Sequence, residues 1–398
     1  MVIPKGPGAL SSYRGLQTSP IILRRSFATR GHDPLRILFC GSDEFSIASL
    51  KALREEHLSR PDRISSIDVV CRPGKRVGRG LKQIREVPIK AAASNLSLPV
   101  HEIDTFTGWT PPIPGGFINL VIAVSFGLFV PPRILNYAKY GGLNVHPSLL
   151  PNFRGPAPLH HTLLAGHTRT GVTLQTLHPT HFDNGVILDQ TPAPGFEIPN
   201  PDSCTVPQLL EVVAPMGGRM LLDGIKSGLF VPPVKDAGWR ASEGQETLIH
   251  AAKIKPEDRH IDWANWPWAE INRRNRILGP LWSKALVSNR SVDGSLSFQQ
   301  RRVVFTEIEE VDPLEGCDAF ALIPGVPFVD DTSPIEPQQG KGLYVFTRDG
   351  KLIRIRQMKV EGMQSADGVR AALKGKMLSD QTFGSNAARY TTFYNPFQ

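Results

Sequence analysis

Apolar and polar positions along the chain follow a pattern that predicts short strands separated by helices. Three short apolar runs are typical of buried strands: residues 35–41, 67–71 and 117–124. Between the first two, apolar residues from Phe45 to Ala52 recur at helical spacing, and either Ser42 or Asp43 can cap that helix. Strands that alternate with helices predict a mostly parallel α/β sheet covered by helices on both faces.

The same pattern continues through the middle of the chain. Residues 143–146 form another short strand, which Pro147 interrupts, and a helix is expected at 159–165. Val172 and Leu174 then alternate with polar residues on a strand, and residues 185–188 form one more.

Beyond residue 231 the composition shifts to proline, glycine, serine and charge, which indicates a linker. A helix near residues 263–277 and several short strands follow, so we expect a smaller β-rich, OB-like barrel domain. The acidic, proline-rich interval 307–339 is interpreted as a long loop or insertion in that domain. The predicted division is a leader at 1–32, a first domain at 33–232, a linker at 233–246, a second domain at 247–380 and a tail at 381–398.

Charge changes the picture mainly at the amino terminus. Residues 1–32 carry five of the basic residues and no acid, so they account for most of the net charge of +8. This stretch is arginine-rich and contains serines but no continuous apolar core, which favours a mitochondrial presequence over a secretory signal. A disordered basic tail that binds nucleic acid is the alternative. The first interpretation predicts a protein of the mitochondrial matrix.

Other compositional features exclude several classes of protein. No apolar run approaches the length of a transmembrane helix, so we expect no membrane partner. The four cysteines lie far apart, without CxxC spacing, and predict neither a disulfide framework nor a thiolate metal site.

Candidate chemistry gathers where the strand at 143–146 ends. Strand alternation places Asn144 and His146 on one face, and ligands of open α/β sheets bind at the carboxyl ends of strands. Asp183 stands in an Asp-Asn-Gly turn sequence, which by itself indicates only a turn. The first strand is followed by Gly41 but lacks GxGxxG spacing, so a dinucleotide site is not favoured.

The sequence from Asn144 to Gly155, NVHPSLLPNFRG, resembles the signature of the 10-formyltetrahydrofolate-dependent formyltransferases. The segments at 170–173 and 183–185 continue the resemblance in order and spacing, over roughly residues 35–190. Pro147 departs from the small residue usual in that family, and the turn after Asp183 also differs. The resemblance implies a Rossmann-like first domain and formyl transfer to an amine.

The resemblance also implies roles for the three polar residues. The amide of Asn144 and a protonated His146 would donate hydrogen bonds to the oxyanion that forms when an amine attacks the formyl carbon. Asp183 would orient the imidazole and pass protons through water. The co-substrate would be 10-formyltetrahydrofolate, held by backbone and apolar contacts at Ser125, Phe126, Gly127, Leu128, Ser148, Leu149 and Leu150. No metal is required, because the histidines between residues 146 and 181 lack ligand companions.

A basic segment suggests the acceptor. It resembles the insertion loop used by the branch of this family that acts on methionyl-tRNA, and its cations suit phosphates. Those cations are Arg72, Lys75, Arg76, Arg79, Lys82 and Arg85. A solvated basic loop is the alternative interpretation.

The second domain resembles the carboxyl-terminal domain of the same branch, through residues 252–254 and 261–263. Residues 251–398 hold 20 basic and 18 acidic residues, so we expect a polarised surface. The candidate tRNA contacts there are Lys253, Arg273, Arg274, Arg276, Arg354 and Arg356. We expect a monomer that binds initiator methionyl-tRNA and reduced folate. A formyl-folate hydrolase, a formyltransferase for a small amine and a non-catalytic RNA-binding protein remain as alternatives.

Overall fold

The structure of the chain is a computed structural model. It describes residues 31–111, 116–239, 247–290, 295–314, 317, 323–330, 342–384 and 389–398. The predicted leader therefore lies almost entirely outside the described residues. None of the helices described is both long enough and apolar enough to cross a membrane.

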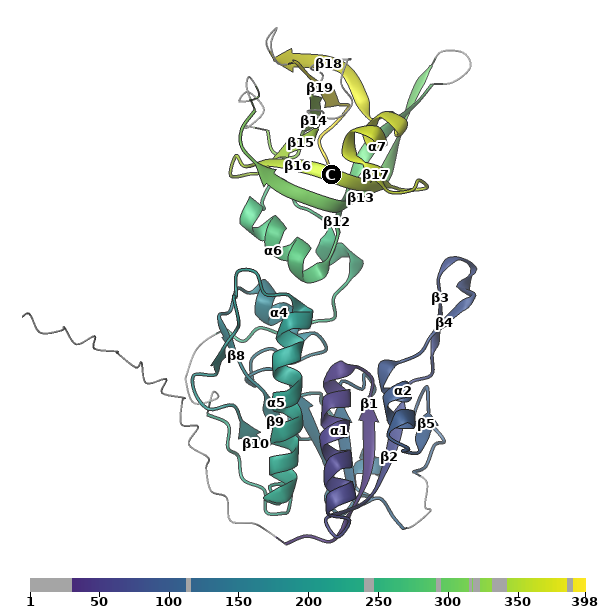
Figure 1. Cartoon of the computed structure of the whole chain (residues 1–398), viewed down its shortest axis with the longest axis vertical. Helices are drawn as coiled ribbons and strands as arrows, with labels where there is room; N and C mark the ends of the chain where they lie inside the picture. Colours follow the sequence, from purple (N-terminus) through teal and green to yellow (C-terminus); the bar gives the residue numbers. More distant parts are fainter. Residues whose placement is uncertain are drawn as a thin grey trace, which may run out of the picture.

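The first domain is built on a seven-stranded sheet that is parallel in its greater part (Figure 1). Strands β5, β2, β1, β6 and β7 are parallel, whereas β9 and β10 run antiparallel to their neighbours. In spatial order the strands are β10 (Ile187–Gln190), β9 (Thr173–Thr176), β7 (Gly142–His146), β6 (Leu120–Val124), β1 (Leu35–Gly41), β2 (Ile64–Cys71) and β5 (Val100–Glu102). The predicted mostly parallel α/β sheet is confirmed.

Both long helices of this domain and two shorter ones cover one face of this sheet. That face packs against α1 (Glu44–Ser59), α2 (Pro88–Asn95), α4 (Pro158–Leu164) and α5 (Val206–Lys226). The other face, with Leu38 and Val121, is covered by the loops around Phe106 and Phe126 and by the short α3 (Pro132–Leu135). The prediction of helices on both faces is confirmed, although the helix described on the second face is the single turn of α3.

Two elements answer the capping and helix predictions. Asp43 is the N-cap of α1, where its carboxylate accepts a hydrogen bond from the Ser46 amide at 3.1 Å. Helix α5 was not predicted, because Pro215 and neighbouring glycines interrupt its pattern. Its apolar stripe, which includes Leu209 and Leu221, nevertheless packs into the core between the helix and the sheet.

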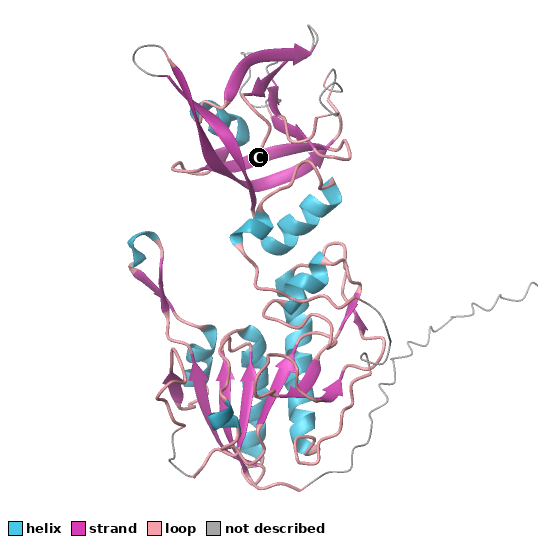
Figure 2. Ribbon diagram, turned by 180° about the vertical axis from the view of Figure 1, so that it is seen from behind, coloured by secondary structure: helices cyan, strands magenta, loops and turns pink. Residues whose placement is uncertain are grey.

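The basic segment forms a β-hairpin that projects from the first domain (Figures 1 and 2). Strands β3 (Lys75–Val77) and β4 (Gln83–Arg85) pair antiparallel, and η1 (Arg79–Leu81) forms the tip. Gly78 and Gly80 have φ values of +81° and +74°, a backbone region that favours glycine. The predicted insertion loop is thus a folded ribbon in this structure.

The second domain is a curved antiparallel sheet packed on α7 (Gly368–Lys374). Helix α6 (Trp268–Leu278) precedes it in the chain. The first domain also contains a separate pair of short strands, β8 (Arg169–Thr170) and β11 (Phe196–Glu197). The strands of the second domain are β12 (Leu281–Arg290), β13 (Leu296–Val311), β16 (Leu352–Val360), β15 (Leu343–Phe346), β14 (Pro327–Asp330), β19 (Arg389–Phe393) and β18 (Leu378–Gly384), with β17 (Ala366–Asp367) beside β16.

Two predictions for this domain need correction. The end of β13 and the whole of β14 lie inside the interval 307–339, so its described part is not a long loop. The described residues of the predicted tail at 381–398 are not a tail, because β19 and Phe397 belong to the domain core. Gln398 also exchanges two backbone hydrogen bonds with Lys284 on the edge strand β12, which closes the sheet towards a barrel.

The described residues that flank positions 240–246 of the predicted linker remain attached to the first domain. Ala237 donates a backbone hydrogen bond to Ile187, and the Trp239 indole donates to the Thr191 carbonyl at 2.8 Å. After the linker, Ile249 and Ala251 form backbone hydrogen bonds with residues 153–157. These contacts bring the chain that enters the second domain directly past the loop after β7.

Candidate functional site

Asn144 and His146 emerge together at the carboxyl end of β7, as strand alternation predicts. Their neighbours Leu143 and Val145 point into the core beneath the sheet. His146 is the last residue of the strand and is 5% exposed. The two polar side chains therefore lie at the sheet edge where ligands of α/β folds bind.

Asp183 joins them from a turn that is distant in sequence. Its carboxylate Oδ1 lies 3.5 Å from the imidazole Nδ1 of His146. Asp183 itself adopts the left-handed backbone, with φ of +52°. The carbonyl of Thr176 would lie 1.7 Å from a Cβ at Gly185, so glycine is required there for the turn to close on β9.

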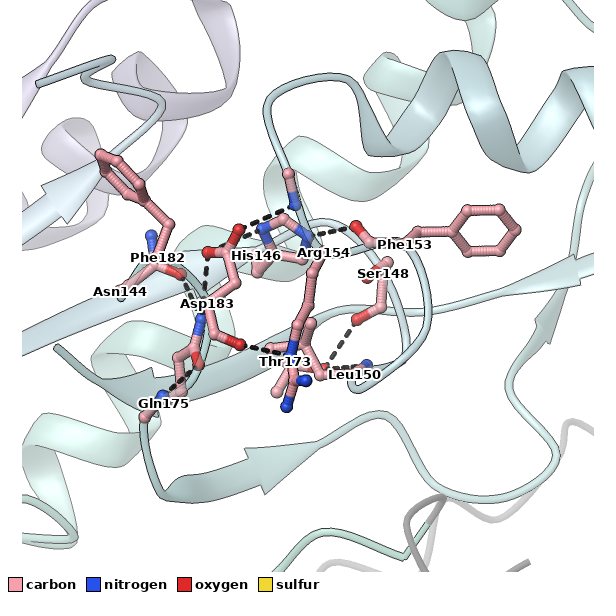
Figure 3. Close-up of polar contacts among 12 residues, drawn as sticks. Asn144, His146, Ser148, Leu150, Phe153, Arg154, Thr173, Gln175, Phe182 and Asp183 are labelled. Atoms are coloured by element: carbon pink, nitrogen blue, oxygen red, sulfur yellow. Dashed lines mark hydrogen bonds and ion pairs between the residues drawn. The ribbon is translucent and has the colours of Figure 1, made fainter. Parts of the chain in front are cut away.

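Both nitrogens of the His146 ring face acceptors in this conformation (Figure 3). Nε2 lies 2.8 Å from the Phe153 carbonyl, which can only accept, so Nε2 carries a hydrogen. Nδ1 faces the Asp183 carboxylate. A protonated imidazolium satisfies both contacts, because both of its nitrogens donate.

The loop after β7 is fastened by hydrogen bonds from buried side chains. The Thr173 hydroxyl donates to the Ser148 carbonyl at 2.7 Å, and the Ser148 hydroxyl donates to the Asn152 carbonyl at 2.8 Å. The loop also holds Asp183 directly: the Gly155 amide donates to its Oδ2 at 2.9 Å, and the Arg154 guanidinium donates to its carbonyl at 2.7 Å. The carboxylate is thereby held through Oδ2, the oxygen that does not face His146 in the ion pair.

Gln175 on β9 completes the polar cluster and was not among the predicted site residues. Its side-chain NH2 donates to Asn144 Oδ1 at 2.9 Å and to Asp183 Oδ1 at 3.3 Å. The sequence does contain a signal for Gln175, because polar Thr173 and Gln175 alternate with apolar Val172 and Leu174 along this strand. Alternation indicates which face of the sheet the Gln175 side chain lies on, but not which residues it binds.

The predicted folate contacts fall into two groups. The side chains of Phe126, Ser148, Leu149 and Leu150 are buried within the protein, so they can form walls or offer backbone groups only. Ser125 is exposed with φ of +49°, and Leu128 lines an open pocket of about 330 Å³. Other residues lining that pocket are Thr105, Phe106, Thr107, Phe129, Pro131 and Arg133.

The described part of the chain shows neither a cluster of metal-binding side chains nor an exposed cysteine. Among the described residues, no set of three or more histidine, cysteine or acidic side chains is arranged to hold a metal ion. The cysteines Cys40 and Cys71 are buried, and burial raises the pKa of both thiols, that of Cys71 to about 11. Such thiols are poor nucleophiles at neutral pH.

The predicted cations of the hairpin are mostly exposed. Lys75, Arg76, Lys82 and Arg85 all project into solvent, while Arg72 at its base lies 3.6 Å from Asp104. The side chain of Arg79 lies outside what the structure describes. Lys75 stands directly opposite Arg85, a like-charge pair that concentrates positive charge on the ribbon.

The predicted tRNA contacts on α6 have intramolecular partners in this structure. Arg273 donates to the Leu164 carbonyl of α4, and Arg276 donates to the Asp202 carbonyl, both in the first domain. Burial and the neighbouring Arg273 lower the pKa of Arg276, whose Nε has no hydrogen-bond partner among the described residues. Arg274 binds Glu270 and lies over the Trp266 ring. Arg273 and Arg276 therefore link α6 to the first domain, whereas the contacts of Arg274 stay within α6 and the segment before it.

The remaining candidates of the second domain are more accessible. Lys253 is exposed, and Arg354 and Arg356 alternate with the buried Ile353 and Ile355 as predicted. Both arginines lie near Glu309, at 3.9 Å and 2.6 Å. Part of their charge is thus neutralised within the domain.

Comparison with known proteins bears on this site. Residues 35–199 match the family model described as formyl transferase. The chain is 31% identical to the mitochondrial methionyl-tRNA formyltransferase of Saccharomyces cerevisiae, over 69% of this chain and 75% of that protein. It is 32% identical to the human mitochondrial methionyl-tRNA formyltransferase, over 82% and 75% respectively. A Cereibacter sphaeroides methionyl-tRNA formyltransferase is also 32% identical, over 62% of this chain and 75% of its own length. The resemblance noted in the sequence is confirmed, and the chain belongs to the methionyl-tRNA formyltransferase family.

Proposed function

We propose that the protein transfers the formyl group of 10-formyltetrahydrofolate to the amino group of methionyl-tRNA. The observation that carries the proposal is the meeting of Asn144, His146 and Asp183 at the carboxyl edge of the sheet. Two hydrogen-bond donors and a carboxylate are the groups that an acyl transfer between nitrogens requires.

The amine nitrogen attacks the formyl carbon, and the formyl oxygen becomes an oxyanion. The Asn144 amide NH2 and the Nε2–H of His146 donate to this oxyanion. In the structure Nε2–H is bound to the Phe153 carbonyl at 2.8 Å, so the substrate oxygen exchanges with that carbonyl as acceptor. Because one acceptor replaces another, the imidazolium stays hydrogen-bonded throughout the exchange.

Asp183 supports the proton balance of the reaction. Its Oδ1 faces His146, which stabilises the imidazolium, and its Oδ2 is held by the Gly155 amide. The attacking amine must lose a proton, and the leaving N10 of the folate must gain one. Asp183 passes this proton through water, so no net change in the protein remains after the turnover.

The folate lies beside the loop at 125–128, where Leu128 and Phe129 line the open pocket of about 330 Å³. This pocket is partly apolar and includes Arg133, which suits a ligand with an aromatic ring system and carboxylates. Exposed backbone at Ser125 and Gly127 supplies further hydrogen-bonding groups.

The tRNA approaches the same end of the first domain. The hairpin and the second domain both rise from the end at which the parallel strands terminate (Figures 1 and 2). An RNA end placed between them reaches the polar cluster, and the hairpin cations Lys75, Arg76 and Arg85 face phosphates. Lys253, Arg354 and Arg356 supply the second contact area.

The site of action is proposed to be the mitochondrial matrix, with residues 1–32 as the presequence. The basic, acid-free composition of that leader supports this location. Fusion of residues 1–32 to a fluorescent protein tests it: import into mitochondria is expected, and a cytosolic signal would contradict it.

The function is tested by incubating the purified protein with 10-formyltetrahydrofolate and charged initiator tRNA. Formylmethionyl-tRNA is expected to form at a rate proportional to enzyme. Consumption of the folate without formylation of the aminoacyl-tRNA would instead indicate the hydrolase, and tRNA binding without turnover of folate would indicate an RNA-binding protein.

A further inference from the structure

Gln175 occupies the centre of the polar cluster without reaching its open side. It is 1% exposed and lies directly opposite Asn144 in the antiparallel pairing of β7 and β9. Figure 3 shows it beside Asp183, on the side away from the Phe153 loop. A buried side chain in this position cannot touch substrate, but it contacts two residues that can.

All polar atoms of the Gln175 side chain are used. Nε2 has two hydrogens and two acceptors, Asn144 Oδ1 at 2.9 Å and Asp183 Oδ1 at 3.3 Å. Oε1 accepts from the Gly185 amide at 3.1 Å, which ties the turn after Asp183 to β9. One side chain therefore connects the amide donor, the carboxylate and the turn that carries the carboxylate.

These contacts determine which way the Asn144 amide faces. Its Oδ1 accepts from Gln175, and its Nδ2 donates to the Ala123 carbonyl at 2.8 Å. A flipped amide would place oxygen against the Ala123 carbonyl and NH2 against the Gln175 NH2, two repulsive contacts. The second hydrogen of Nδ2 has no acceptor in the part of the chain that the structure describes, so it is left for an incoming oxygen.

The same contact restrains Asp183. Its Oδ1 accepts a hydrogen bond from Gln175 and lies 3.5 Å from His146 Nδ1. The carboxylate therefore cannot rotate away from the ring without losing the Gln175 hydrogen bond. Buried hydrogen bonds of this kind hold catalytic groups in place at little entropic cost during reaction.

We propose that Gln175 is a positioning residue for formyl transfer, which sets the donor face of Asn144 and the orientation of Asp183. The proposal rests on the proposed function of the Asn144, His146 and Asp183 site. It differs from a purely structural role, in which a buried glutamine only stabilises the sheet.

Two substitutions and a matched control test the proposal. Gln175→Met keeps length and removes the hydrogen bonds, while Gln175→Glu keeps shape and replaces the donor NH2 by an acceptor. The control is Asn119→Leu, which removes another buried amide of the first domain, one that binds only the backbone near Pro34 and Arg36. All variants are assayed at a temperature at which circular dichroism shows them folded.

We expect kcat for formylation to fall about ten- to a hundredfold in Gln175→Met and further in Gln175→Glu, with KM for both substrates within about twofold. Asn119→Leu should lower Tm and leave kcat near that of the wild type. In an Asn144→Ala background the kcat effect of Gln175→Met should shrink, because one of the groups that it positions is gone. Unchanged kcat in folded Gln175→Met would overturn the proposal. So would a fold-loss of kcat from Gln175→Met that is as large in the Asn144→Ala background as in the wild type.

Crystal structures separate this proposal from the proposed function. In Gln175→Met, the Asn144 amide or the Asp183 carboxylate should be displaced or disordered relative to wild type. If both side chains keep their places, Gln175 does not position them, whatever the reaction. If they move but wild-type protein formylates no methionyl-tRNA, the positioning role stands and the proposed acceptor falls.

Discussion

His146 and His57 both donate a ring N–H to a backbone carbonyl, at 2.8 Å and 2.7 Å respectively. Only His146 of these two also has a carboxylate on its other nitrogen. The two histidines therefore share one kind of backbone contact, and the carboxylate of Asp183 distinguishes the surroundings of His146. His57 lies near the end of α1 and is a natural control for His146.

We expect His146→Ala to lower kcat for formylation by about a hundredfold or more, since one oxyanion donor is lost. His57→Ala removes a comparable hydrogen bond far along α1 and should leave kcat nearly unchanged. Filter binding of methionyl-tRNA should be similar for both variants and wild type. Equal loss of activity in the two variants would contradict the catalytic role of His146.

Asp183 illustrates the limit of sequence reasoning at this scale. The Asp-Asn-Gly sequence predicts a turn, and a turn is what forms, with the positive φ at Asp183 itself. The approach of its carboxylate to His146 depends on the Gly155 amide and on Gln175, which are distant in sequence. Local propensity carries no information about such partners.

At the scale of elements, α1 and α5 are joined by a buried charge. The Glu56 carboxylate is 5% exposed and binds Lys226 of α5 at 3.0 Å, as well as Arg63. Burial alone would raise the pKa of Glu56, but the hydrogen bonds and charges of Lys226 and Arg63 outweigh it and lower that pKa. The ionised carboxylate therefore stabilises the folded state.

Because the folded pKa of Glu56 is lowered, its stabilisation is present above the unfolded value of 4.5 and is lost as pH falls through the folded value. We expect Glu56→Gln to lose about 1.5–3 kcal/mol of unfolding free energy at pH 7. The deficit relative to wild type should shrink below pH 4.5, as urea unfolding would measure. Glu55→Gln, an exposed neighbour, should show neither effect; a deficit independent of pH would refute the electrostatic account.

The hairpin gives a second prediction at this scale. Lys75 and Arg85 face each other across β3 and β4, so neutralising both removes a repulsion and should not unfold the ribbon. We expect Lys75→Gln with Arg85→Gln to raise KM for tRNA and to reduce the slope of log KM against log salt by about one per lost phosphate contact.

The matched control for the hairpin is Lys51→Gln with Lys235→Gln, which removes the same charge from exposed positions on α1 and the predicted linker. That variant should retain the salt slope of wild type. If both double variants change the slope equally, the effect comes from net charge rather than from contact by the hairpin.

At the scale of the whole molecule, α6 joins the two domains. Arg273 and Arg276 donate to carbonyls of the first domain, and Ile277 and Leu278 of the same helix pack into its core. Since the hairpin belongs to the first domain and the barrel to the second, this junction sets the space that a bound RNA must fit.

We expect Arg273→Ala with Arg276→Ala to increase the radius of gyration in small-angle scattering and to raise KM for tRNA. The salt slope should stay near that of wild type, because the lost contacts are between domains. An unchanged radius with a flattened salt slope would show that these arginines bind phosphates, as the sequence predicts. Arg274→Ala, whose contacts stay within the second domain, is the control.

Periodicity by itself predicted every strand of the seven-stranded sheet except β5, as well as the β-rich second domain and the exit of Asn144 and His146 at a strand end. These features follow from alternation and apolar runs, which act between near neighbours in the chain. Only the tertiary structure decided that Asp183 and Gln175 join them, that residues 389–398 close the second domain, and that Arg273 and Arg276 lie at a domain boundary. Each of these depends on contacts between residues distant in sequence, where packing and hydrogen-bond geometry select the partners. The polar cluster is thus half encoded in one strand and half assembled by the fold.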